Sequence, residues 1–394
     1  MQLGVNFPRG FRSAGVYCGI KKPGLLDLAL IVSEREASVA GVFTTNRVCA
    51  APVRWSRQVV AGGVARAIIA NSGNANCLTG EQGERDAQRM AELVAKRLGC
   101  PPTQVVVAST GVIGVPLPMN AVETGIALAF ERLSDGDDRA TADAILTTDS
   151  ASKRASLTVD TPGGEVRIGA IAKGAGMIAP KMATMLAFIT TDAVIDPADL
   201  QACLTRVVDA TFNSITVDGD TSTNDMVIAL ANGASGAQLT GDALQVFEHG
   251  LHQVCEYLAK RIVKDGEGAS RIFEVRVLGA VDPDAARLIA RTIAESLLVK
   301  TAIHGGDPNW GRILAAAGRA GAPMDLNRAR LYLQGTLVFE NGRPAEYDEQ
   351  ALVEAMQTEE VLLDLQLGEG DGAARFWSSD LTAEYVKINA HYRT

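Results

Sequence analysis

Residues 171–193, IAKGAGMIAPKMATMLAFITTDA, most constrain what this chain can fold into. The apolar residues are interrupted by Lys173 and Lys181, whereas a membrane-spanning helix needs about 20 predominantly apolar residues. The glycines and the proline before Lys181 predict a loop in which the backbone comes close to another group. The apolar run after Lys181 predicts a buried strand or helix segment with one hydroxyl group, that of Thr184, at its start.

The hydroxyl group of Thr184 has two interpretations. Most buried threonines only hydrogen-bond to neighbouring groups, and this stretch taken alone favours that role. The alternative is a nucleophile. If the peptide bond before Thr184 is cut, the new α-amino group can act as the base for the adjacent hydroxyl, and no histidine is needed. An α-amino group has an ordinary pKa of about 7.7–8.0, so part of it is unprotonated near neutral pH.

Composition describes an ordinary globular enzyme. The chain has 394 residues, enough for two or three domains or one large composite one. Aromatic residues make up only 5% and glycines number 39, which fits an α/β enzyme better than an aromatic-rich binding scaffold. The formal net charge of −9 argues against nucleic-acid binding, which depends on an excess of Lys and Arg.

The cysteines and the N-terminal sequence predict a reducing location. None of the six cysteines lies in a C-x-x-C arrangement, so we expect no metal or redox motif. The N-terminal sequence lacks the layout of a signal peptide, and no stretch of 18 apolar residues occurs. We therefore expect a cytoplasmic protein that does not enter a membrane.

Local patterns predict several elements. Asp196 can cap a helix that begins at Pro197. The other expected elements are a strand pair at 28–32 and 39–43, an amphipathic helix at 84–98, a hairpin of strands 155–160 and 165–172, and a helix at 282–298.

Two short motifs suggest chemistry. The strand at 105–108 ends in Ser109-Thr110-Gly111, and a strand that stops there exposes N–H groups and hydroxyls. An acyl-transfer enzyme needs such donors at the developing oxyanion, although the motif is also common in simple turns. Glu267 lies between two glycines, which allow close approach of a ligand, and its carboxylate could pair with a substrate ammonium group.

The segment 211–227, TFNSITVDGDTSTNDMV, has two interpretations. Asp218, Asp220 and Asp225 could suggest a metal loop. The spacing does not fit a calcium-binding EF-hand, because no Glu stands at the twelfth place counted from Asp218. We favour a hydrogen-bonded structural loop.

The segment KGAGMIAPKMATMLAFITTDA closely resembles the cleavage-site motif of the bifunctional ornithine acetyltransferase/N-acetylglutamate synthase family of arginine biosynthesis. The resemblance covers nearly the whole chain through at least six separated motifs, which include FTTN…AAPV, NSGNAN, STGVIG, VDGDTSTND and DGEGA. It implies an α/β (α+β) protein with a layered α/β/β/α fold. It also implies that the chain cuts itself between Ala183 and Thr184. The resulting chains, 1–183 and 184–394, would share one core and assemble, we expect, into a heterotetramer.

The resemblance further implies an activity. Thr184 would take an acetyl group from N2-acetylornithine and pass it to glutamate in a ping-pong reaction, with Thr110 and Gly111 as the oxyanion hole. The implied substrate contacts are Thr147 (with Thr148 as a competitor), Lys173, Thr184, Glu267, Asn389 and Thr394. By charge, Lys173 suits an α-carboxylate and Glu267 suits the δ-ammonium group of ornithine. No cofactor is expected, and acetyl-CoA is an alternative acetyl donor.

The sequence departs from the family pattern at a few positions. His304 stands where an aromatic residue is usual, Gly306 where Glu is frequent, and His391 where an acidic residue is common. We interpret His304 as a packed or half-exposed ring, and expect Asp307, Asn309 and Arg312 to fix its segment. Two other functions stay open: an amidase or aminopeptidase with the same kind of nucleophile, and a non-catalytic binding protein.

Overall fold

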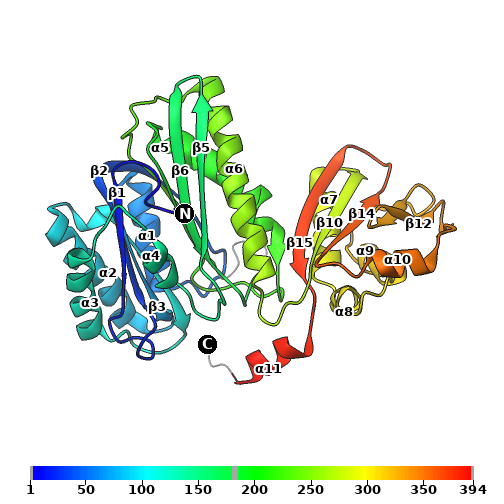
Figure 1. Ribbon diagram of the computed structural model, residues 1–394, viewed down its shortest axis with the longest axis horizontal. Helices are drawn as coiled ribbons and strands as arrows, with labels where there is room; N and C mark the ends of the chain where they lie inside the picture. The colour runs from blue at the N-terminus through cyan, green and yellow to red at the C-terminus, as the bar shows by residue number, and fades with distance from the viewer. Residues whose placement is uncertain (1–2, 180–184, 392–394) are drawn as a thin grey trace. The chain divides into compact units, whose positions relative to one another are not determined.

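The computed structural model describes residues 3–179 and 185–391. Ala183, Thr184 and Thr394, three of the predicted site residues, lie outside the described residues. The chain forms two compact units. The first unit comprises the described residues within Met1–Asn213 and Asp220–Ile262, and the second those within Ser214–Gly219 and Val263–Tyr392. Figure 1 shows the elements of each unit.

The first unit contains an eight-stranded mixed sheet. Its strands are β1 (Phe11–Val16), β2 (Leu28–Phe43), β3 (Val64–Asn74), β4 (Val105–Val112), β5 (Lys153–Thr161), β6 (Gly164–Lys173), β7 (Leu186–Thr191) and β9 (Met226–Ala231). They lie in the order β4-β3-β2-β9-β7-β6-β5, with β1 beside β2. Two pairs, β3–β4 and β7–β9, are parallel. The predicted hairpin is confirmed as β5–β6.

The predicted strand pair at 28–32 and 39–43 is wrong, because both runs belong to the single 16-residue strand β2. Different neighbours hold its two halves. The first half pairs with β1 and the second half with β9. The pairing with β3 shifts register between Val32 and Ala37. Glu34, Arg35 and Glu36, in between, therefore remain extended with exposed side chains, and they form no turn.

Helices of the first unit cover its sheet. They are α1 (Ala51–Ala61), α2 (Gly80–Leu98), α3 (Met119–Glu131), α4 (Arg139–Asp143), α5 (Pro197–Ala210), most of α6 (Gly241–Lys264) and the 3₁₀ turns η1 (Pro102–Gln104) and η2 (Phe212–Ser214). Met90 of α2 and Ile126 of α3 belong to one apolar core with strand residues such as Ile69. Asp196 accepts a hydrogen bond from Ala198 N at 2.9 Å, so the predicted cap of α5 is confirmed. In Figure 1, α6 runs beside β5 and β6.

The second unit contains a seven-stranded sheet in the order β13-β12-β11-β14-β10-β15-β8. Its elements are β8 (Ile215–Thr216), β10 (Ile272–Ala280), β11 (Arg330–Leu333), β12 (Thr336–Glu340), β13 (Arg343–Pro344), β14 (Glu360–Gln366), β15 (Gly372–Ser379), α7 (Pro283–Ala294), α8 (Leu297–Gly305), α9 (Trp310–Gly318), α10 (Glu349–Ala355) and α11 (Ala383–His391). Alternate residues of β10, Phe273, Val275 and Val277, pack with α7 in one apolar core.

The helix predicted at 282–298 is wrong beyond residue 294, because α7 and α8 are separate. Ser296 has extended backbone (φ −71°, ψ 115°), which separates the end of α7 from the start of α8. The break lets Val299 and Ile303 of α8 join the core of the second unit.

Two mixed sheets with helices confirm the predicted α/β class. Among residues 3–179 and 185–391, no helix combines the length and the apolar character needed to cross a membrane.

Candidate active site

The motifs that end β3 and β4 lie side by side because these strands are parallel. The register pairs Ser72 with Thr110 and Gly73 with Gly111. Gly111 has a φ of +133°, and a Cβ atom there would lie 2.3 Å from the carbonyl carbon of Gly73. Only glycine fits this position, because both the backbone conformation and the neighbouring main chain exclude a side chain. The oxyanion role of Thr110 and Gly111 stays a prediction.

Lys173, the last residue of β6, lies between two of the predicted threonines. Its ammonium group donates hydrogen bonds to Thr147 Oγ1 at 2.9 Å and to Thr110 Oγ1 at 3.3 Å. The lysine is only 1% exposed. The structure thus brings Thr110, Thr147 and Lys173 together from β4, the segment after α4, and β6. The contact favours Thr147 over Thr148 at the site.

Asp149, which the sequence did not identify, holds this cluster in place. Its Oδ1 accepts hydrogen bonds from Gly174 N at 2.6 Å and Lys153 Nζ at 2.8 Å. Its Oδ2 accepts one from Thr147 N at 3.1 Å and lies 4.0 Å from Lys173 Nζ. Burial alone would raise the pKa of Asp149, but the two ammonium groups and these donors hold the pKa below its ordinary value. Asp149 is therefore a buried anion that anchors the loop after β6.

Lys21, which is only partly buried, adds a second ammonium group near Lys173. It donates to the carbonyl oxygens of Leu26 at 2.9 Å and Leu146 at 2.5 Å. Burial lowers the pKa of Lys21 to about 8 against the opposing charge of Asp27, and the charge of Lys173 lowers it further. Two interacting cations, Lys173 buried and Lys21 partly buried, favour binding of an anionic group such as a carboxylate. No sequence motif around Lys21 pointed to a functional site, so this residue was not predicted.

The segment with several aspartates contacts the two strand-end motifs. Asn224 Nδ2 donates to the carbonyl oxygens of Ala75 at 2.6 Å and Ser109 at 2.9 Å. Thr44 Oγ1 donates to Ser222 O at 2.6 Å. These bonds agree with a hydrogen-bonded structural loop. Within the described ranges, no group of three or more His, Cys, Asp or Glu side chains is placed to hold a metal ion.

Asp225, at the end of the same segment, lies next to the start of β7. Its Oδ1 accepts a hydrogen bond from Met185 N at 3.0 Å. Burial raises the pKa of Asp225 well above its ordinary value, although the Met185 N–H group and the charge of Lys173 oppose this shift. Met185 directly follows Thr184 in the chain. The carboxyl group therefore anchors the residue after the predicted nucleophile.

The second unit brings together two other predicted residues. Glu267 follows the C-terminal end of α6 and is 9% exposed. Its Oε2 accepts a hydrogen bond from Asn389 Nδ2, in α11, at 2.8 Å. The residues come from distant parts of the chain, 122 positions apart, so this pairing is a product of the tertiary fold.

His304 is half-exposed, as expected, and its Nδ1 lies 2.9 Å from Asp380 Oδ2. The predicted fixing residues also make local contacts. Asn309 caps α9 by accepting from Arg312 N at 3.2 Å, and its Nδ2 donates to Asp307 Oδ2 at 3.0 Å.

Comparison with known proteins gives the same family over nearly the whole chain. The model of the ArgJ family matches residues 12–394. The arginine biosynthesis bifunctional protein ArgJ of Thermosynechococcus vestitus is 49% identical, over 99% of this chain and 98% of that protein. The protein of the same name from Rhodopirellula baltica is also 49% identical, over 98% and 96% of the two chains.

A solved structure agrees with these relatives. It is that of the arginine biosynthesis bifunctional protein ArgJ from Bacillus halodurans, which is 40% identical with a TM-score of 0.50. The match covers 52% of this chain and 97% of that chain, so that chain is about half as long. The similarity confirms the fold type predicted from the sequence. By the family model and by relatives matched over nearly their whole length, this chain belongs to the ArgJ family.

Proposed function

We propose that this chain is a glutamate N-acetyltransferase of arginine biosynthesis, which moves an acetyl group from N2-acetylornithine to glutamate. The near-complete match to bifunctional ArgJ proteins of arginine biosynthesis supports this function. The observation that carries it is the cluster of Lys173, Thr110 and Thr147, where a buried ammonium group and two hydroxyls meet beside a glycine-lined strand end. Such a cluster suits a substrate with an α-carboxylate next to an acetyl group.

The proposed reaction has two halves. Thr184 Oγ attacks the acetyl carbonyl carbon of N2-acetylornithine, and its own α-amino group takes the hydroxyl proton. Thr110 and Gly111 stabilise the oxyanion. The C–N bond breaks, the proton passes to the departing amine, and ornithine leaves an acetyl-threonine. The α-amino group of glutamate then attacks this ester, and Thr184 recovers its hydroxyl.

The substrate contacts follow from charge. Lys173 and Thr147 hold the α-carboxylate end of the substrate, and Glu267 binds the δ-ammonium group of ornithine. Asn389 and Thr394 are the remaining proposed substrate contacts. No cofactor takes part, and acetyl-CoA serves as a second acetyl donor, which fits the word bifunctional in the names of the relatives.

The same proposal includes self-cleavage between Ala183 and Thr184, because only cleavage frees the α-amino group. Strands before and after this bond, β6 and β7, pair in one sheet, so the chains 1–183 and 184–394 would stay associated. The half-length chain in the Bacillus halodurans structure supports division of the chain. We further propose a cytoplasmic heterotetramer of the two chains. The hydrolase alternative is not favoured, because the full-length relatives are ArgJ proteins.

The test is the intact mass of the denatured protein after brief incubation with N-acetylornithine. The expected result is two fragments that split at Ala183/Thr184, with one acetyl group on the C-terminal fragment. A single unmodified chain would overturn the proposal. Release of free acetate without any need for glutamate would instead point to a hydrolase. Thr184→Ala should neither cleave nor transfer.

A further inference from the structure

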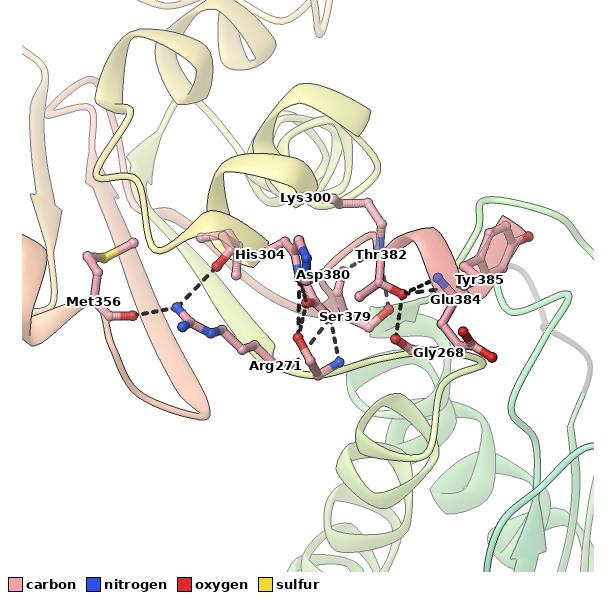
Figure 2. A network of polar contacts seen from close by, with 12 residues as sticks. Gly268, Arg271, Lys300, His304, Met356, Ser379, Asp380, Thr382, Glu384 and Tyr385 are labelled. Carbon is pink, nitrogen blue, oxygen red and sulfur yellow. Dashed lines mark hydrogen bonds and ion pairs between the residues drawn. The ribbon is translucent and has the colours of Figure 1, made fainter. Parts of the chain in front are cut away.

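In the second unit, the loop that carries Glu267 and the segment that leads into α11 meet at the side chain of Asp380 (Figure 2). Asp380 Oδ1 accepts hydrogen bonds from the backbone N–H groups of Ser270 at 2.9 Å and Arg271 at 3.1 Å. Its Oδ2 accepts from Ser270 Oγ at 2.5 Å and lies 2.9 Å from His304 Nδ1. The carboxylate side chain is fully buried. A buried carboxylate with this many partners fixes the geometry of the groups around it.

A second connection lies two residues further along the chain. Thr382 Oγ1 donates to Gly268 O at 2.7 Å and accepts from the backbone N–H groups of Glu384 and Tyr385 at the start of α11. Gly268 has a φ of +69°, and a Cβ atom there would lie 2.5 Å from Tyr385 N. The loop and the helix are therefore in direct main-chain contact, and Thr382 bonds to both.

Two cations support this junction, Lys300 from the neighbouring helix α8 and Arg271 from the loop itself (Figure 2). Lys300 of α8 is almost fully buried and donates to Ser378 Oγ at 3.1 Å and to Ser379 O, directly before Asp380. Burial lowers the pKa of Lys300 to about 8, although nearby carboxylates, Asp380 among them, oppose this shift. Arg271 Nη1 donates to Met356 O at 2.9 Å and so fixes the other end of the loop.

The consequence concerns Glu267, one residue before Gly268. Asn389 of α11 binds one carboxylate oxygen of Glu267, Oε2, at 2.8 Å. The direction of the carboxylate thus depends on the loop and on α11 together. Asp380 and Thr382 are the side chains that join these two elements.

We propose that Asp380 is a positioning residue that, together with Thr382, sets the carboxylate of Glu267 and thereby gives the enzyme its preference for an acetyl donor with a free terminal ammonium group. This inference rests on the proposed function. The inference goes beyond the proposed function because it assigns donor selectivity to residues outside the predicted substrate contacts. These residues form the junction between Ser270 and Asp380, which lie 110 positions apart in the sequence.

The experiment compares two donors that differ only in the ammonium group, N2-acetylornithine and N2-acetylnorvaline, with full-length enzyme and glutamate as acceptor. In Asp380→Ala, the kcat/KM for N2-acetylornithine divided by that for N2-acetylnorvaline should fall by about tenfold. The reason is that a displaced Glu267 carboxylate loses its charge-assisted contact with the ammonium group of the donor. The loss should appear as a higher KM for N2-acetylornithine, and the reaction with N2-acetylnorvaline should change much less. Asp380→Asn keeps an acceptor for the Ser270 and Arg271 N–H groups and should restore most of the ratio.

Thr382→Val provides a second test, since it breaks the other connection and leaves the buried carboxylate intact. It should lower the ratio in the same direction, and it decides the question if Asp380→Ala does not fold. Asp282→Ala is the matched control, because it removes the capping carboxylate of α7 in the same unit. It should lower thermal stability without changing the ratio.

The outcomes separate the two proposals. If the unmodified enzyme transfers no acetyl group from N2-acetylornithine, the proposed function fails. If it transfers the group with a clear preference for the charged donor, and Asp380→Ala and Thr382→Val retain that preference, the positioning role is overturned.

Discussion

The carboxyl group of Asp225 accepts a hydrogen bond from the backbone N–H group of Met185, at 3.0 Å, immediately after the predicted nucleophile. Asp225 is also one of the most buried carboxyl groups described, and burial raises its pKa well above the ordinary value. A buried carboxyl group costs stability. The position of Asp225 beside the residue that follows the predicted nucleophile therefore explains its presence better than the fold alone does.

The first prediction concerns this anchor. Asp225→Ala should slow both self-cleavage and acetyl transfer by at least about tenfold, because a small displacement of the nucleophile lowers the rate strongly. Cleavage is followed by gel electrophoresis after expression, and transfer by ornithine release. Asp225→Asn retains an acceptor for Met185 N and should impair cleavage less than Asp225→Ala. Equal loss in both variants would contradict an anchoring role.

The raised pKa of Asp225 also predicts a pH dependence of stability. Between the ordinary pKa of aspartate, about 3.9, and the raised folded-state pKa, the folded protein binds more protons than the unfolded one. The contribution of Asp225 to the free energy of unfolding therefore falls as pH rises through this window. Asp225→Asn removes this effect, so its melting temperature relative to that of the unmodified protein should increase from pH 4 to pH 7. A difference that stays constant with pH would show that Asp225 does not titrate in this way.

The second prediction tests the close approach of β3 and β4. Gly111→Ala should lower the free energy of unfolding by about 2–4 kcal/mol, since strain at positive φ is joined by contact with the backbone of Gly73. Gly114→Ala is the matched control, because Gly114 also has a positive φ (+81°) but has open space around its Cβ position. It should cost about 1 kcal/mol. Urea unfolding of both variants decides whether the close approach adds to the strain.

The third prediction concerns Asp149. Asp149→Asn should lower the free energy of unfolding by about 3 kcal/mol at neutral pH, because Lys153 and Lys173 would lose their shared buried anion. The folded-state pKa of Asp149 is lowered, so its stabilising contribution is complete above the ordinary pKa of about 3.9 and is lost as pH falls towards the folded-state value.

Unfolding measured at several pH values should therefore show a difference between Asp149→Asn and the unmodified protein that is constant above about pH 5. It should narrow in more acidic solution. Glu81→Gln is the control, since it breaks an exposed ion pair with Arg85 that is worth little. If Asp149→Asn were as stable as Glu81→Gln, the buried ion pairs of Asp149 with Lys153 and Lys173 would not stabilise the loop.

The fourth prediction separates the two substrates. Glu267→Gln should raise the KM for N2-acetylornithine at least about tenfold through loss of a charged partner for the δ-ammonium group. The KM for glutamate should change much less. Glu359→Gln, which removes an exposed partner of Lys264 in the same unit, is the control. Equal effects of Glu267→Gln on both substrates would argue against ornithine recognition by this residue.

Features that depend on neighbouring residues were predictable from the sequence. The helix that begins at Pro197 was predicted because Asp196 and the proline act within one helical turn. The hairpin β5–β6 was predicted because turn residues, Thr161-Pro162-Gly163-Gly164, lie between two strand-like runs. The same local patterns failed for β2, where a polar segment is kept extended by strands from other parts of the chain.

By itself, the sequence determined the family, the predicted nucleophile and most of the expected substrate contacts, because each lies within a short motif whose residues act locally. Only the tertiary structure decided which of these residues meet. It placed Thr147 against Lys173, added Asp149 and Lys21 to the cluster, and joined the Glu267 loop to α11 through Asp380. The physical reason is that such contacts are set by strand register and core packing between segments far apart in the chain, which no local pattern encodes.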